Sequence, residues 1–209
     1  MAAERRPTKS PMSTARSSED APAREFLFVD PDVADSDILI AGLDRPLAIV
    51  RLTRDADPLG QIATALAGER DVDTLHIVAH GQPGALRLAG TRVDRDLLAA
   101  SASRLAAIRG TLSDDSTIVL QACSVAAGSE GRLFVAALAN ALGARVEASA
   151  EPLGGSAGWD GLTGPDLPYA PAALAAYPHA LIIATFGVVT TINTTTTLTS
   201  NEGGVTLSV

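Results

Sequence analysis

The sequence predicts an α/β protein, a doubly wound three-layer sandwich with a mainly parallel central sheet. Between residues 25 and 150, short β-branched or aromatic runs alternate with longer segments of helical period, a pattern typical of βαβ units. Most of the short runs are apolar nearly throughout, as expected of strands that helices cover on both faces. With 209 residues, of which 46% are hydrophobic, the chain has room for one ordinary domain with appendages.

Five strands are expected from the apolar runs. They are Glu25–Asp30, Leu47–Leu52, Thr74–His80, Thr117–Cys123 and Arg145–Ser149. Helices are expected between them. One should cover Asp94–Leu112, with Asp94 as its cap and Leu98, Leu105 and Ile108 on one face. Another should follow Cys123, with Ser129 as its cap and Gly143 at its end. A third is expected over residues 58–67, and residues 31–43 favour a helix over a loop with a short strand.

The composition suggests four consecutive regions. Residues 1–24 are rich in Ser, Pro, Ala and charge and are expected to form a disordered leader without a signal-peptide core. Residues 25–165 would form the α/β domain, and residues 166–180 a Pro/Ala-rich linker. The Thr-rich residues 181–209 are prone to form strands and would begin a further β-repeat module.

Charge and cysteine content restrict the possible partners. The net charge of −8 argues against nucleic acid, because phosphate binding needs a basic face. A single cysteine cannot form an internal disulfide. The longest apolar run, residues 180–189, is well short of the roughly 20 residues that span a bilayer, so no membrane span is expected.

Three reactive side chains end the predicted strands, namely Asp30, His80 and Cys123. Functional groups of a parallel sheet cluster beyond the carboxyl ends of its strands, so an imidazole is expected beside a thiol. A neighbouring imidazole favours the nucleophilic thiolate over the thiol. Gly81 allows close backbone approach, and its N–H could form an oxyanion hole together with the N–H of Cys123.

The strand ends IVAHG and IVLQAC resemble the signature of the caspase, legumain, gingipain and separase group of cysteine peptidases. The resemblance implies a caspase-like fold, with Cys123 as nucleophile, His80 as general acid/base and Gly81 as oxyanion donor. It also makes Gln121 the counterpart of the glutamine that lines the primary specificity pocket. Ser124 and Val125 depart from the caspase motif. Asp30 could favour a basic residue before the cut bond, or it could cap the next helix.

A closer resemblance covers about residues 25–162. The strings LHIVAHGQPGALRLAGTRVD, LQACSVAAGSEGRLFVAALANALGARVEAS and GWDG look like a bacterial domain of unknown function. That domain is found mainly at the amino-terminal ends of large surface or secreted adhesins with cadherin-like or calcium-binding repeats. The resemblance implies a cysteine endopeptidase, without a cofactor, that acts on polypeptide, with its own longer chain as one candidate substrate. Export would not depend on a signal peptide; a cytoplasmic protein is the alternative.

Other interpretations of the same residues remain open. The domain could be a non-catalytic adhesin module that retains the fold, with Cys123 as a small buried hydrophobe. His76 and His80 match H-x-x-x-H, but that zinc pattern needs a helix and this stretch predicts a strand, so no metal site is expected. Residues 154–158 match the G-x-S-x-G of serine hydrolases, but they lack the preceding strand and the following helix.

Overall fold

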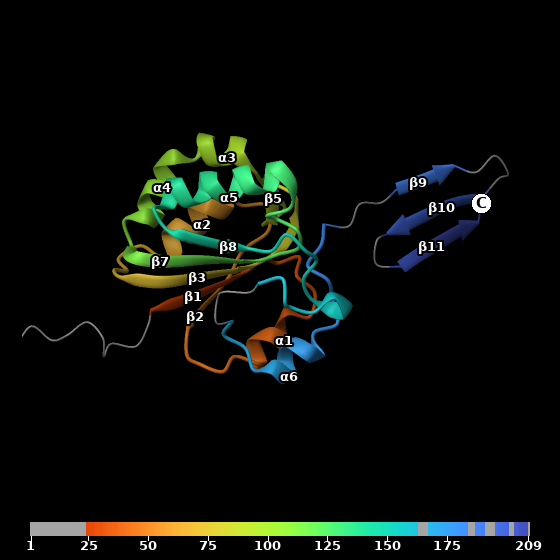
Figure 1. Cartoon of the computed structure of the whole chain (residues 1–209), viewed down its shortest axis with the longest axis horizontal. Coiled ribbons are helices and arrows are strands. Elements are labelled where there is room, and N and C mark those ends of the chain that lie inside the picture. Colours follow the sequence, from red (N-terminus) through yellow and green to blue (C-terminus); the bar gives the residue numbers. More distant parts are fainter. Residues whose placement is uncertain (1–23, 163–166, 184–186, 191–194, 201–202, 209) are drawn as a thin grey trace, which may run out of the picture.

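The computed structural model confirms the α/β class and the mainly parallel sheet (Figure 1). It describes residues 24–162, 167–183, 187–190, 195–200 and 203–208. The central sheet has five parallel strands in the order β2-β1-β3-β7-β8. Their bounds are β1 Glu25–Val29, β2 Ala48–Arg51, β3 Val72–Val78, β7 Leu112–Gln121 and β8 Arg145–Ala148. All five expected strands are therefore present.

The strand order places the topological switch point of the sheet between β1 and β3. From β1 the chain passes to the edge strand β2 and then crosses back to β3 on the other side of β1. Connections on the two sides of this point run in opposite directions, and functional groups of parallel sheets gather beyond the strand ends at such a point. Asp30 follows β1 and His80 lies just beyond β3, so both lie at this point.

Helices cover both faces of the sheet (Figure 1). One face carries α2 Pro58–Ala65, α3 Arg95–Ala100, α4 Ala102–Arg109 and α5 Gly128–Leu142, and the other carries α1 Ser36–Ala41 and α6 Pro171–Ala176. Alternate strand residues supply the two cores. Phe28 packs in a cluster with Leu75, Ile118 and Phe134, whereas Leu27 packs in a second cluster with Val119.

Two helix predictions needed correction. The helix expected over Asp94–Leu112 is divided at Ser101 into α3 and α4, and β7 already begins at Leu112. Asp94 does cap α3, because its carboxylate accepts a hydrogen bond from the N–H of Leu97 at 3.2 Å. Ser129 is not the cap of α5, since that helix begins at Gly128. Gly143 ends α5 in the left-handed conformation, as predicted.

A short antiparallel sheet after β3 was not anticipated. Its strands are β4 His80–Gln82, β5 Ala85–Leu88 and β6 Thr91–Val93. Gly84 and Gly90 occupy the two turns with positive φ, which explains their place between such short strands. His80 therefore begins β4 and does not end β3, so its backbone is fixed by pairing with Arg87.

The carboxyl-terminal part of the domain packs onto the sheet. Residues 166–180 were expected to be a linker, but their described part, residues 167–180, contributes α6. Tyr169 and Tyr177 are buried in the second cluster together with Leu181. The Tyr177 hydroxyl donates to the carbonyl of Ala34 at 3.0 Å. Residues 1–23 of the expected leader and the expected boundary at residue 165 lie outside the described residues. In the Thr-rich segment, β9 Gly187–Thr190, β10 Thr195–Ser200 and β11 Gly203–Ser208 pair antiparallel.

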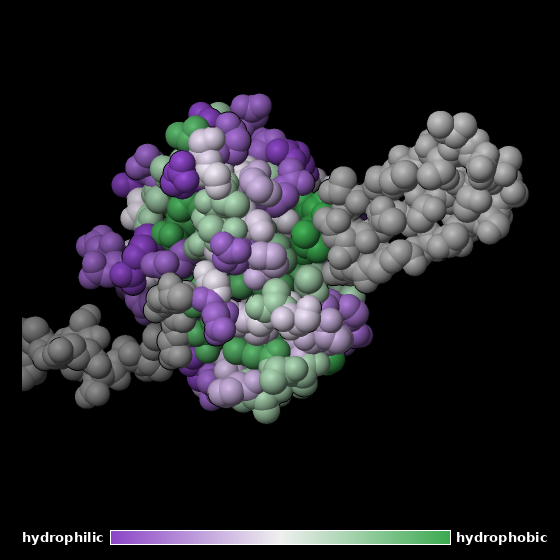
Figure 2. Space-filling model, turned by 45° about the vertical axis from the view of Figure 1, so that its right-hand side comes forward, coloured by the Kyte–Doolittle hydropathy of each residue, from purple (hydrophilic) through white to green (hydrophobic). Residues whose placement is uncertain are grey.

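Figure 2 shows hydrophilic residues over much of the visible face, with hydrophobic ones in smaller groups between them. Within residues 24–162 and 167–183, the large hydrophobic side chains that are exposed are those of Ile49 and Leu133. No helix in the described part of the chain is long and apolar enough to cross a bilayer.

We expect Tyr177→Ala to lower the free energy of unfolding by about 3–5 kcal/mol, the usual cost of emptying a buried aromatic site. Tyr177 is among the largest fully buried side chains, with 1% of its surface exposed. Urea denaturation followed by circular dichroism measures the change. Leu133→Ala, at a side chain that is 48% exposed, should stay within about 0.5 kcal/mol of wild type. Equal effects of the two substitutions would contradict a structural role for residues 167–181.

Candidate functional site

His80 and Cys123 lie side by side at the carboxyl edge of the sheet. The last residues paired between β3 and β7 are Val78 and Gln121, and His80 and Cys123 each follow two residues later. Contact continues beyond the paired residues, because a Cβ placed on Gly81 would lie 2.5 Å from the carbonyl oxygen of Cys123. The absence of a side chain at Gly81 thus allows the ends of β3 and β7 to come together. This role is separate from the one predicted from the sequence, which was to let a substrate approach the backbone.

The imidazole of His80 is oriented by a backbone carbonyl. Its Nε2 lies 3.1 Å from the carbonyl oxygen of Asp32. A carbonyl only accepts, so Nε2 carries the hydrogen and Nδ1 keeps a free lone pair in the neutral ring. Nδ1 is buried, and no described residue forms a hydrogen bond with it. This tautomer leaves a proton acceptor next to Gly81.

Asp30 supports the loop that orients His80. Its side chain, 1% exposed, accepts hydrogen bonds from the N–H of Asp32 at 2.9 Å and from the N–H of Ala89. Burial raises the pKa of Asp30, and the two backbone N–H groups oppose that rise. Helix α1 begins after Asp35, so Asp30 does not cap it as proposed from the sequence. The carboxylate instead holds Asp32, whose carbonyl contacts His80.

The thiol of Cys123 rests against the backbone of Leu153. The side chain is 0% exposed. Sγ accepts a hydrogen bond from the N–H of Leu153 at 3.0 Å and donates to its carbonyl oxygen at 3.2 Å. The next residue, Ser124, has φ of 55°, an uncommon conformation for a residue other than glycine. The chain therefore turns sharply immediately after the candidate nucleophile.

Two backbone N–H groups converge on one carbonyl oxygen at this edge. The N–H of Gly81 donates to the carbonyl of Leu181 at 2.9 Å, and the N–H of Cys123 donates to the same oxygen at 3.0 Å. These are the two donors that the sequence predicted for an oxyanion hole. Their acceptor is a residue of the same chain.

Further backbone hydrogen bonds, to Leu153 and to Gly81, hold the segment around Leu181 in place. Its own N–H donates to the carbonyl of Leu153 at 2.9 Å, and the N–H of Ile183 donates to the carbonyl of Gly81 at 3.2 Å. The Leu181 side chain is 0% exposed and belongs to the second apolar cluster. Leu153, Leu181 and Asp32 were all missed in the sequence analysis. The only signal at Leu181 was the apolar run that starts at Ala180.

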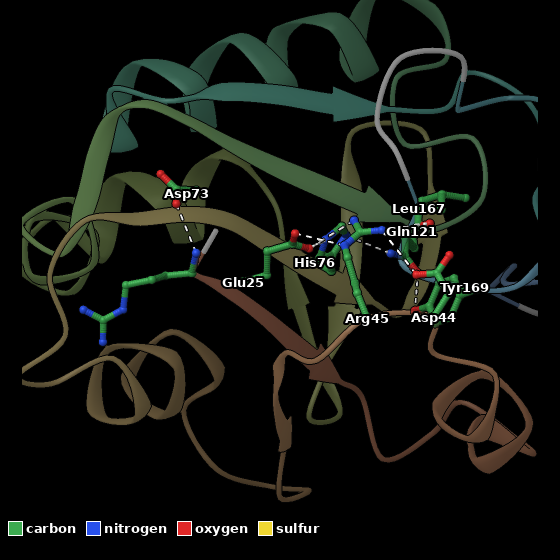
Figure 3. Close-up of polar contacts among 9 residues, drawn as sticks. Glu25, Asp44, Arg45, Asp73, His76, Gln121, Leu167 and Tyr169 are labelled. Atoms are coloured by element: carbon green, nitrogen blue, oxygen red, sulfur yellow. Dashed lines mark hydrogen bonds and ion pairs between the residues drawn. The ribbon is translucent and has the colours of Figure 1, made fainter. Parts of the chain in front are cut away.

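Gln121 lies in a buried polar network (Figure 3). Its amide oxygen accepts from the Tyr169 hydroxyl at 2.8 Å, and its nitrogen lies 3.2 Å from Nδ1 of His76. His76 in turn donates a hydrogen bond from Nε2 to the Glu25 carboxylate at 3.0 Å. The Arg45 guanidinium donates two more hydrogen bonds to that carboxylate, at 3.0 and 3.1 Å. Both polar ends of the Gln121 side chain are therefore occupied, and so are both ring nitrogens of His76.

The alternative serine motif does not form a nucleophile elbow. Ser156 is exposed in a single 3₁₀ turn, Gly155–Ala157, and the nearest preceding strand, β8, ends at Ala148. An elbow requires a strand that runs directly into the serine and a helix that leaves it. The glycines at this position shape a surface loop instead.

We expect the stability lost on Glu25→Gln to depend on pH. The hydrogen bond from His76 and the ion pair with Arg45 lower the pKa of Glu25, although burial opposes the effect. The ionised carboxylate therefore stabilises the fold above its unfolded pKa of about 4.3, and this contribution disappears as the pH falls through the lowered folded value. At pH 7 the substitution should cost about 1–3 kcal/mol, because the buried partners lose a charged acceptor.

Urea denaturation between pH 3 and pH 8 measures this dependence. Asp37→Asn is the matched control, because Asp37 also pairs with an arginine, Arg51, but its side chain is 86% exposed. The control should cost less than about 1 kcal/mol at every pH. A Glu25→Gln penalty that stays constant down to pH 3 would contradict the assignment.

The chain matches one protein family across the region that contains the sheet and the site. Neither the curated proteins nor the solved structures include a match to it. The family model is a domain of unknown function, DUF4347, and it matches residues 26–181. That span runs from β1 to Leu181 and includes His80, Gly81 and Cys123. The chain therefore belongs to the DUF4347 family.

Proposed function

We propose that this domain is a caspase-like cysteine endopeptidase in which Cys123 is the nucleophile and His80 the general acid/base. One observation carries the proposal. The N–H groups of Gly81 and Cys123 point at the same carbonyl oxygen, at 2.9 and 3.0 Å, beside a thiol and an imidazole. Two such donors are the arrangement that stabilises the oxyanion formed when a peptide carbonyl is attacked.

The tautomer of His80 supports its proposed role. A general base needs a free lone pair within the site and a third group that orients the ring. The carbonyl of Asp32 supplies the orientation at 3.1 Å, and Nδ1 supplies the lone pair. Asp30 and Asp32 are then positioning residues, because they act on the substrate only through His80.

The resting thiol must move before it can react. Sγ is bonded to the N–H and carbonyl of Leu153, so it has to turn about its χ1 torsion toward the substrate carbonyl. Transfer of the thiol proton to His80 gives the thiolate, which attacks the carbonyl carbon, and the imidazolium then protonates the leaving amine. Gly81 and Cys123 stabilise the oxyanion between the two steps.

The proposed setting is an adhesin-type polypeptide at the cell surface or outside the cell, exported without a signal peptide; a cytoplasmic location is the alternative. The resemblance to the amino-terminal domains of repeat-containing adhesins supports the first setting, and so does the Thr-rich segment with strands β9 to β11. The substrate in this proposal is a polypeptide, and no cofactor takes part.

A non-catalytic adhesin module is the second candidate. The observation that favours it is the complete burial of Cys123, whose sulfur has backbone partners at Leu153. In that case the hydrogen bonds to Leu181 would serve only to hold the carboxyl-terminal segment on the sheet. The two candidates differ in whether the sulfur ever becomes a nucleophile.

We expect the wild-type chain to cleave members of a diverse peptide library, and Cys123→Ala to show no activity above background. His80→Ala should reduce the rate at least about 100-fold, the typical contribution of general acid/base catalysis. It should also slow alkylation of Cys123 by iodoacetamide at pH 7, because the thiolate is no longer favoured. Mass spectrometry measures both reactions.

Leu133→Ala controls for nonspecific effects of substitution and should keep wild-type rates. The peptidase proposal fails if no library peptide is cut and alkylation proceeds equally fast with and without His80. That result would favour the non-catalytic module.

A further inference from the structure

We infer that the domain cleaves its own chain at the Leu181–Ile182 peptide bond. The inference rests on the peptidase function proposed above and names the substrate of the same site. In a peptidase of this kind, the carbonyl that occupies the oxyanion hole belongs to the residue just before the cut bond. Here that carbonyl is the one of Leu181, which accepts from both Gly81 and Cys123.

The backbone around Leu181 is bound in the way that a peptidase holds an extended substrate. Ala180 bridges Gly154 in antiparallel fashion, and Ile182 bridges Gly81 in parallel fashion. The N–H of Leu181 donates to the carbonyl of Leu153 at 2.9 Å. Main-chain pairing of this type fixes the register of a bound strand, so it sets which peptide bond lies at the thiol.

The Leu181 side chain fits an apolar subsite. It is 0% exposed and packs in the cluster that contains Leu153, Tyr169 and Tyr177. A charged side chain at this position would lose its hydration without gaining a partner in the cluster. The specificity expected before the cut bond is therefore for leucine or a similar aliphatic residue, not for a basic residue as considered from Asp30.

The leaving group lies on the histidine side of the site. Ile182 pairs with Gly81, the residue directly after His80. The amine that must be protonated as the bond breaks thus belongs to the residue beside the proposed acid. The two oxyanion donors thus lie on the Leu181 carbonyl, and one of them belongs to the proposed nucleophile itself.

The reaction balances with water as the only co-reactant. The thiol proton moves to Nδ1 of His80, and Sγ forms a bond to the Leu181 carbonyl carbon while the C=O electron pair moves to the oxygen. Collapse of this intermediate breaks the C–N bond, and the proton on His80 passes to the Ile182 nitrogen. Water, deprotonated by His80, then hydrolyses the thioester, leaving a Leu181 carboxylate and a free thiol.

The test follows the intact mass of the full-length chain at neutral pH, for wild type and Cys123→Ala. Wild type should yield one fragment that ends at Leu181 and one that begins at Ile182, and Cys123→Ala should remain uncut. Because the cut is intramolecular, its first-order rate should be the same over a 100-fold range of protein concentration.

Two substitutions at the same residue form a matched pair. Leu181→Met keeps an aliphatic side chain of similar volume and should stay within about tenfold of the wild-type rate. Leu181→Asp should abolish the cut. Mapping the junction in wild type does not depend on whether Leu181→Asp folds.

Failure of this inference is distinguishable from failure of the proposed function. Self-cleavage would be overturned if the wild-type protein cuts library peptides and shows His80-dependent alkylation of Cys123 but leaves the Leu181–Ile182 bond intact. Residues 180–183 would then be a segment that occupies the site without being cut. A junction elsewhere, or a rate that rises with protein concentration, would also overturn it. Absence of both peptide cleavage and His80-dependent alkylation would overturn the peptidase itself.

Discussion

The hydrogen bonds that Leu181 accepts from Gly81 and Cys123 stabilise the fold at the same place where the proposed chemistry would occur. Cys123 and Gly81 are buried, and a buried N–H without an acceptor costs about 1–3 kcal/mol. The edge of the sheet therefore needs a carbonyl oxygen at this point, and the chain supplies one through residues 180–183. An extended backbone presents a carbonyl in the required direction, and Leu181 does so here.

The close approach of β3 and β7 creates that pair of donors. Their register carries His80 and Cys123 to equivalent positions beyond Val78 and Gln121, and only a residue without Cβ fits at Gly81, because the carbonyl of Cys123 lies within 2.5 Å of the Cβ position. Asp30 and Asp32 then set the histidine ring from the neighbouring loop. The two donors and the histidine ring are thus positioned by three neighbouring parallel strands, β1, β3 and β7.

Local sequence patterns predicted the five strands of the central sheet and the residues at their carboxyl ends. The apolar runs of the five strands have the period and length of buried parallel strands, and parallel neighbours bring their carboxyl ends together. The contacts of Leu181 could not be predicted in this way, because its partners are remote in sequence and its apolar run suits many environments. Gln121 and Asp30 were expected at a substrate pocket, but Tyr169, His76 and backbone N–H groups occupy their side chains.

Burial of a lone cysteine usually indicates a packing role. Burial is also compatible with a role as nucleophile when the substrate is a segment of the same folded chain. A domain that acts once on its own chain needs no pocket open to solvent, since its substrate folds into place with the rest of the core. After cleavage at Leu181, the new carboxylate would face the N–H groups of Gly81 and Cys123, which favour negative charge. The product segment would then compete with other peptides for these two donors.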